Sequence, residues 1–243
     1  MALAVLAVAF VISNLILGRE PAIIALADTG NRRVFLRSEN TYREAASTIL
    51  AGSFANTNKL TIDTKNIAAA MQKQFPELEH VSVTLPVIGR RPALYIQPAR
   101  PVLLLKSADG GVFVVDAAGR ALINASQASA VGKLGLPIAE DQSGLPIKLG
   151  QIALPSDNIA FITEVVGQLR AKKITISGLV LPKATNELDV RIEGAPYTVK
   201  FNLRGDARAE AGAYLAVKQH FEREHKTPGS YVDVRVDNKV YYR

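Results

Sequence analysis

The last fourteen residues of the chain, 230–243, have the alternating pattern of a β-strand. Valines stand at positions 232, 234, 236 and 240, and charged residues stand at 233, 235, 237 and 239. A period of two places one set of side chains on a buried face and the other in water. A strand at a sheet edge has backbone groups that a partner strand can pair with, while outward charges restrain indiscriminate pairing. From the pattern alone, a strand that only completes its own sheet is the favoured interpretation.

Residues 2–18 form an uncharged run, ALAVLAVAFVISNLILG, in which only Ser13 and Asn14 are polar. About seventeen residues is the lower limit for a helix that crosses the hydrocarbon core of a membrane. We therefore expect residues 1–20 to be an uncleaved transmembrane anchor of a single-pass cell-membrane protein, with the later domains outside the cytoplasm. A cleaved signal peptide is disfavoured because no basic residue precedes the run, and a core helix would have a polar face.

The basic residues closest to this run conflict with that topology. Arg19, Arg32, Arg33 and Arg37 all follow the run, and none precedes it. Taken literally, the positive-inside rule would place the C-terminal part in the cytoplasm. A basic tail upstream of Met1 would remove the conflict, and the sequence does not show one.

Composition narrows the classes of partner. The chain has no cysteine, which excludes a disulfide framework and thiolate metal sites. Its formal net charge of +7 favours anionic surfaces such as lipid headgroups or wall polymers. No basic run is interleaved with aromatic residues, so the sequence predicts no nucleic-acid partner.

Residues 21–100 have the pattern of a small α+β domain. Gly52 and Pro76 end two helical patterns, and alternating apolar residues follow the second. The order strand, helix, helix, strand, strand predicts helices on one face of a sheet. The expected elements are strands near 22–27 and 34–37 around a turn at 28–31, helices at 42–51 and 62–74, and strands at 81–85, 93–97 and 102–105.

Residues 101–243 predict a mostly antiparallel sheet with two helices. Apolar stripes at helical spacing mark the helices, and Ser156 or Asp157 is expected to cap the first. Residues 124–150 are expected to be a surface loop with one short strand. The remaining elements are a hairpin at 103–105 and 112–115, strands at 120–123, 174–181, 187–193 and 196–203, helices at 155–173 and 207–225, and the terminal strand. The expected fold class is therefore α+β.

The sequence contains no recognisable catalytic motif. His80, His220 and His225 have no metal-ligand spacing with one another or with a carboxylate, and phosphate-loop, dinucleotide-binding and nucleophile-elbow motifs are absent. Arg204-Gly-Asp206 is best explained as a turn whose Asp206 caps the next helix. We therefore expect a protein that is not an enzyme, with no cofactor, no metal site and no small-molecule substrate.

Four short motifs, taken in order, resemble the FtsQ/DivIB cell-division family. They are Phe75–Val83 (FPELEHVSV), Val114–Gly119 (VVDAAG), Asn202–Asp206 (NLRGD) and Ser230–Arg235 (SYVDVR). In this resemblance, residues 21–100 correspond to a POTRA domain and residues 101–243 to the β-sheet domain that follows it. The chain departs from the family at Arg91-Pro92, where a Trp-Pro pair is usual, and in lacking a basic N-terminal tail.

The resemblance implies a non-catalytic scaffold that binds other single-pass division proteins, of the FtsB/DivIC and FtsL types, during septum formation at the membrane. In the family a partner adds a strand to the end of the C-terminal sheet. The residues to which this carries over are Arg204, Tyr231, Val234, Arg235, Val236, Asn238, Val240 and Tyr242. Asp237-Asn238 fits either a two-residue turn or a straight strand.

Two other functions remain as alternatives at this point. One is a POTRA-containing factor for assembly or transport in the cell envelope. The other is a membrane-anchored protein that binds or hydrolyses wall polymers. Clustered carboxylates in a cleft would favour the hydrolase, and a long β-barrel segment would favour a transport pore. The sequence offers neither feature.

Overall fold

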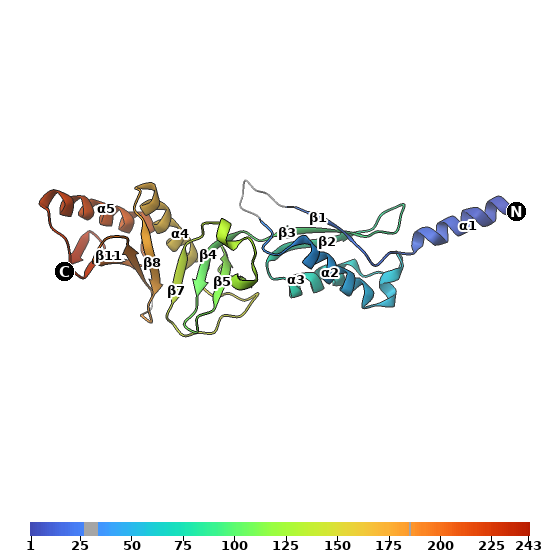
Figure 1. The fold of residues 1–243 in the computed structure, drawn as a ribbon, viewed down its shortest axis with the longest axis horizontal. Helices are drawn as coiled ribbons and strands as arrows, with labels where there is room; N and C mark the ends of the chain where they lie inside the picture. The colour runs from blue at the N-terminus through green and yellow to red at the C-terminus, as the bar shows by residue number, and fades with distance from the viewer. Residues whose placement is uncertain (27–33, 185) are drawn as a thin grey trace. The chain divides into compact units, whose positions relative to one another are not determined.

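The structure, a computed structural model, describes residues 1–26, 34–184 and 186–243. These residues form two compact units, the first made of 1–100 with 126–134 and the second of 101–125 with 135–243. The fold is α+β, and each unit contains one β-sheet (Figure 1). The turn expected at 28–31 lies outside the described residues.

The first unit has a three-stranded sheet with two helices on one face (Figure 1). The sheet order is β1-β3-β2, with β1 parallel and β2 antiparallel to β3. The elements follow the expected order of strand, helix, helix, strand and strand. They are β1 (Ala22–Ala25), α2 (Glu39–Ala51), α3 (Thr64–Gln74), β2 (Leu78–Thr84) and β3 (Ala93–Pro98), with a 3-10 turn at Phe54–Thr57 between the helices.

Both helices begin at capping residues. Ser38 Oγ accepts the N–H of Thr41 at 3.3 Å, and Asp63 Oδ1 accepts the N–H of Asn66 at 2.9 Å. The helices bury their apolar faces against the sheet. That core consists of Tyr42, Ala45, Ala46, Met71, Phe75, Leu78, Leu94 and Ile96.

A segment from further along the chain, 126–134, also belongs to the first unit. The Ser129 N–H donates to the Leu36 carbonyl at 3.0 Å. Arg37 forms an ion pair with the buried Glu77 at 2.7 Å and donates to the Gln127 side chain at 3.2 Å. The sequence predicts only a surface loop with one short strand at 124–150, because polar and small residues give no sign that 126–134 packs with the first unit.

The N-terminal helix α1 (Ala2–Leu15) is shorter than the apolar run. Residues 16–18, the end of the apolar run, are not helical. Ile16 is extended and forms a β-bridge with Asn58, and the Gly18 N–H donates to the Arg90 carbonyl at 2.6 Å. The 14-residue helix is about 21 Å long, against about 30 Å for a hydrocarbon core. Among the described residues, no helix combines the length and apolar character that a membrane crossing requires. The expected transmembrane anchor at 1–20, and the single-pass location built on it, are therefore wrong.

The second unit contains a nine-stranded mixed sheet of order β12-β11-β10-β9-β8-β7-β4-β5-β6. The pairs β10–β11, β7–β8 and β4–β7 are parallel, and the other neighbours are antiparallel. The elements are β4 (Pro101–Lys106), β5 (Val112–Asp116), β6 (Ala121–Asn124), β7 (Ile138–Asp141), α4 (Ser156–Ala171), β8 (Ile176–Leu181), β9 (Glu187–Ile192), β10 (Thr198–Asn202), α5 (Ala207–Glu224), β11 (Tyr231–Val236) and β12 (Lys239–Tyr242).

Helices α4 and α5 cover the same face of this sheet and share one core with it. Asp206 caps α5 as expected, because its carboxylate accepts the N–H groups of Arg208 and Ala209 at 2.9 Å each. The cap expected for α4 is wrong. Pro155 takes the N-cap position without a side-chain hydrogen bond, so Ser156 and Asp157 fall inside the first turn.

Candidate functional site

The C-terminal end of the chain folds into an antiparallel hairpin at one edge of the large sheet. We call β11, β12 and the turn between them, residues 231–242, the C-terminal hairpin. Asp237 and Asn238 form the turn, and Asn238 adopts a positive φ of 59°. Asparagine tolerates this conformation better than most residues. Of the two interpretations left open by the sequence, the structure has the turn.

The outer side of β12 offers free backbone groups. The Arg243 N–H donates to Tyr231 O at 3.1 Å, and the Tyr231 N–H returns to Arg243 O at 3.4 Å. Hydrogen-bonded and non-hydrogen-bonded pairs alternate along an antiparallel ladder, so the backbone groups of Val240 and Tyr242 point away from β11. No strand of the described residues lies beyond β12. This edge therefore presents donors and acceptors at the spacing of a β-ladder.

The opposite edge of the same sheet, β6, is partly covered. The Ala121 N–H donates to the Gln151 carbonyl at 2.9 Å, and the Gly150 N–H donates to the Ala121 carbonyl at 2.7 Å. Arg120 also forms a β-bridge with Ile152. The segment around 150–152 thus binds backbone groups on the outer side of β6, whereas, in the described part of the chain, the corresponding groups on the outer side of β12 are free.

Three exposed side chains at the open edge and at the adjoining end of β11 are apolar or aromatic, beside the exposed Lys239. Val236, Tyr241 and Tyr242 are 46%, 51% and 49% exposed. The ring of Tyr242 packs edge-to-face on Phe221 of α5, with ring centroids 4.9 Å apart, and Val240 packs against the core beside it. Exposed aromatic side chains next to unpaired backbone are typical of partner-binding surfaces.

The valines of the terminal segment divide between core and surface. Val232 and Val234 are buried in the core under α5, whereas Val236 is exposed because the chain turns immediately after it. Val234 therefore supports the hairpin from inside and presents no surface. Tyr231 is half-buried at the start of β11, and Asn238 is exposed at the turn.

On the face away from the helices, five charged side chains form a connected network. We use the term "network" for Glu187 and Asp189 of β9, Lys200 of β10, and Asp233 and Arg235 of β11. Register places Lys200 opposite both aspartates. Lys200 Nζ lies 2.6 Å from Glu187 and 3.2 Å from Asp189. Arg235 binds Asp233 through Nη2 at 2.6 Å and also pairs with Glu187.

The network changes the pKa values of its carboxyl groups. Burial alone would raise the pKa of Asp233, but hydrogen bonds from Arg235 hold it below its ordinary value. For Glu187, burial is likewise outweighed by the hydrogen bond from Lys200, and its pKa is lowered. Asp189 keeps a raised pKa because burial dominates there. The pair Asp233–Arg235 thus fixes the end of β11 at neutral pH.

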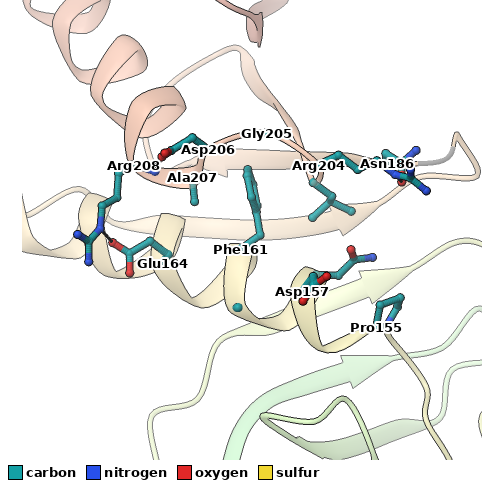
Figure 2. A pocket seen from close by; sticks show the side chains of 13 residues that line it. Pro155, Asp157, Phe161, Glu164, Asn186, Arg204, Gly205, Asp206, Ala207 and Arg208 are labelled. Atoms are coloured by element: carbon teal, nitrogen blue, oxygen red, sulfur yellow. Dashed lines mark hydrogen bonds and ion pairs between the residues drawn. The ribbon is translucent and has the colours of Figure 1, made fainter.

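Arg204 lies at the same end of the sheet, in the turn between β10 and α5. Its Nε donates to Asn186 Oδ1 at 2.9 Å. The turn and the first half of α4 border an open cavity of about 930 Å³, in which Phe161 stands between the Arg204–Asn186 contact and the Arg208–Glu164 ion pair (Figure 2). Asn186 binds Arg204, and the next residue, Glu187, binds Arg235. Two adjacent residues of the chain therefore hold the two arginines.

The structure thus brings most of the sequence-predicted contact residues together on the C-terminal hairpin, with Arg204 in the turn after the adjoining strand. It adds Tyr241, which lies opposite Asp233 and so on the network's face of the sheet. A straight-strand interpretation would not select Tyr241, because the turn changes which residues of β12 face each side. Phe221, the support for Tyr242, is marked in the sequence only as part of a helical stripe.

Three carboxylates, Asp157, Glu164 and Asp206, line the cavity beside Arg204. Glu164 pairs with Arg208, and Asp206 caps α5. The cavity beside Arg204 is lined in the described part of the chain by Arg, Asp, Glu, Asn and apolar residues, with no histidine or hydroxyl nucleophile. Within residues 1–26, 34–184 and 186–243, no group of three or more His, Asp or Glu side chains is placed to hold a metal ion.

A scan against models of known protein families finds no match, and a search of curated proteins finds no match either.

Proposed function

We propose that this chain is a non-catalytic scaffold of bacterial cell division, of the FtsQ/DivIB type, that holds an FtsB/DivIC-like division protein during septum formation. The partner adds a strand to β12, and an FtsL-like protein joins through that partner. The observation that carries the proposal is the open edge of β12, flanked by exposed Val236, Tyr241 and Tyr242.

The order of elements in the first unit supports the same proposal. Its strand–helix–helix–strand–strand order is the one that the resemblance implies for a POTRA domain. The Ser230–Arg235 motif opens the C-terminal hairpin, and the Asn202–Asp206 motif forms the turn that places Arg204. Two of the four motifs that carry the resemblance therefore lie at the proposed binding end of the sheet.

Backbone pairing alone is too weak to hold the partner. Val240 and Tyr242 each direct one donor and one acceptor outward, and each net hydrogen bond contributes about 1 kcal/mol. Four such bonds give about 4 kcal/mol, which corresponds to about millimolar affinity before the cost of association. Tight binding therefore requires the exposed aromatic side chains as anchors. We expect the partner strand to carry apolar residues on the side that faces Tyr242.

The test uses a matched pair of variants at one position. Val240→Pro removes the outward N–H, whereas Val240→Ala shortens the side chain and keeps the donor. Bonds within the hairpin are unaffected by either change, because the Val240 N–H points away from β11. The measurement is co-purification of the FtsB/DivIC-like protein of the same organism with each full-length variant, after circular dichroism shows native folding.

We expect Val240→Pro to abolish co-purification and Val240→Ala to retain it. Lys239→Ala serves as a surface control and should bind normally, because exposed charges contribute only about 0–1 kcal/mol. Normal binding by folded Val240→Pro would refute strand addition at β12.

A further inference from the structure

Two loops of the first unit carry large apolar side chains in water. One loop lies between α2 and α3, and the other lies between β2 and β3. The side chains are those of Phe54, Leu60, Val87 and Ile88, which are 89%, 78%, 93% and 75% exposed. None of the four belongs to the core of the first unit. Apolar side chains gathered in this way mark an interaction surface.

The two loops lie side by side at the C-terminal end of α1. Lys59 Nζ donates to the Val87 carbonyl at 3.2 Å and so joins one loop to the other. The Lys59 N–H donates to the Leu15 carbonyl at 2.9 Å, and the Gly89 N–H donates to Asn14 Oδ1 at 2.9 Å. We use the term "loop surface" for the residues that these contacts bring together, 13–19, 53–61 and 85–92.

The first of these loops is closed by its own hydrogen bonds. The Thr57 hydroxyl donates to the Phe54 carbonyl at 2.7 Å, and the Thr61 hydroxyl donates to the Ala55 carbonyl at 2.6 Å. The loop therefore holds its shape while the ring of Phe54 stays outside. A surface that is already ordered loses less conformational entropy when it binds.

The charges of the loop surface all have one sign. It contains no acidic residue and four basic ones, Arg19, Lys59, Arg90 and Arg91. Arg90 Nε donates to the uncharged Ser13 carbonyl at 3.1 Å. Among the described residues, none of the four basic side chains forms an ion pair with a carboxylate. The nearest carboxylates along the chain are Glu20 and Asp63, and Asp63 is engaged as the cap of α3.

Apolar side chains beside unpaired cations match the chemistry of an anionic lipid surface. Lipid phosphates attract the cations, and the boundary between headgroups and acyl chains takes up the apolar groups. Side chains that protrude as far as Phe54 and Val87 can enter lipid one by one, whereas a protein partner would need a matching pocket for each. Helix α1 is uncharged and continuous with the loop surface, and its exposed Phe10 extends the apolar area.

We propose that the loop surface rests on the anionic face of a lipid bilayer, with the four apolar side chains in the headgroup–acyl boundary and the four basic side chains at lipid phosphates. The contact is peripheral, because side chains of loops make it and no segment has to cross the bilayer. It concerns the first unit and does not depend on β12 or on any partner of the C-terminal hairpin.

The first test places a fluorescent probe in the loop surface. The chain has no tryptophan, so Phe54→Trp introduces a single one. Full-length Phe54→Trp is mixed with vesicles of phosphatidylcholine and phosphatidylglycerol in equal parts. Its emission should shift to shorter wavelength, and lipids brominated along the acyl chain should quench it. Leu145→Trp, at an exposed position of the second unit, is the control and should do neither. No shift for Phe54→Trp, or an equal shift for Leu145→Trp, would overturn the proposal.

The second test measures the cationic contribution by flotation with the same vesicles. A basic side chain near an anionic membrane contributes about fivefold to binding, so Arg19→Gln combined with Arg91→Gln should weaken it about 25-fold. Lys148→Gln combined with Arg223→Gln changes the net charge equally in the second unit and should leave binding nearly unchanged. Vesicles of phosphatidylcholine alone should bind weakly, and added salt should weaken binding to the anionic vesicles. Equal binding to both kinds of vesicle, or an equal loss in the control pair, would contradict the proposal.

The third test separates the loops from α1. Leu60→Ser combined with Val87→Ser removes two exposed apolar side chains that the core does not use, and it should weaken vesicle binding by about tenfold or more. Leu145→Ser combined with Ile152→Ser is the matched control in the second unit. Unchanged binding by the loop variant would assign any lipid contact to α1. Capture of an acidic protein without vesicle binding would assign the surface to a protein partner. Either result would overturn the proposal.

Discussion

Arg235 is the residue whose removal tests the packing of the hairpin most sharply. Its guanidinium donates to Asp233 from Nε at 2.9 Å and from Nη2 at 2.6 Å, and it donates to Glu187 from Nη1. The side chains of Asp233 and Glu187 are only 14% and 11% exposed. Arg235→Ala therefore leaves two largely buried carboxylates with fewer partners, although Lys200 still pairs with Glu187.

The loss of unfolding free energy on Arg235→Ala lies between the values for a buried and for an exposed charged contact. A hydrogen bond to a charged group contributes about 1.5–3 kcal/mol when buried, and an exposed ion pair contributes about 0–1 kcal/mol. The Arg235 side chain is 36% exposed, so solvent screens both of its contacts. We expect Arg235→Ala to lower the free energy of unfolding by about 1–2 kcal/mol. Arg235→Lys should lower it by about half as much, because lysine keeps the charge and lacks the planar fork.

The assay is hydrogen exchange in increasing denaturant, followed on segments 187–202 and 231–243, which reports the second unit separately from the first. Lys239→Ala is the control and should lie within about 0.5 kcal/mol of the unmodified protein. The pKa values of Asp233 and Glu187 are lowered, so the network's contribution is present above their ordinary pKa values and is lost as the pH falls below them. A loss below about 0.5 kcal/mol at neutral pH, or an equal loss at about pH 3, would refute the reasoning.

Two further predictions concern packing. Val234→Ala removes two buried methyl groups from the core and should lower the free energy of unfolding by about 2 kcal/mol. Val236→Ala on the surface should lower it by less than about 0.5 kcal/mol. Urea unfolding of both variants measures the contrast, and equal losses would contradict the assigned burial. Gly119 has a φ of +82°, and a Cβ there would lie 1.8 Å from the Leu154 carbonyl oxygen, so Gly119→Ala should lower the thermal midpoint. Gly167 has open space around it in the middle of α4, so Gly167→Ala should raise the free energy of unfolding by up to about 1 kcal/mol. A neutral Gly119→Ala would contradict the position of the turn.

The sequence predicts most elements because their local signals agree with their tertiary environment. Ser38, Asp63 and Asp206 each cap the helix that they precede, and the short strand within 124–150 is present as β7. The cap of α4 was mispredicted because proline itself can stand at the N-cap. No local pattern reveals that 126–134 joins the first unit, since that packing depends on contacts with Leu36 and Arg37 far away in the chain.

The transmembrane prediction failed for a related reason. Hydropathy counts Ile16–Gly18 as part of the apolar run, whereas pairing with Asn58 and Arg90 draws these residues out of the helix. At the candidate site, the alternation of valines correctly placed Val232 and Val234 in the core. The alternation alone does not decide between a turn and a straight strand at Asp237-Asn238. The structure has the turn, which makes β12 the edge strand and brings Tyr241 to the site, a residue that the sequence does not select. The network was likewise hidden, because it joins three strands that only the register brings together.

The proposed function requires that β12 accept a strand from the partner. The most direct measurement is the exchange rate of individual backbone amides in the labelled full-length protein, with and without saturating FtsB/DivIC-like protein. The amides of Val240 and Tyr242, which point outward, should become strongly protected, while those of the covered edge β6 (Ala121–Asn124) should not change. If the Val240 and Tyr242 amides exchange at the same rate in the saturated complex, the partner binds elsewhere and the account is wrong.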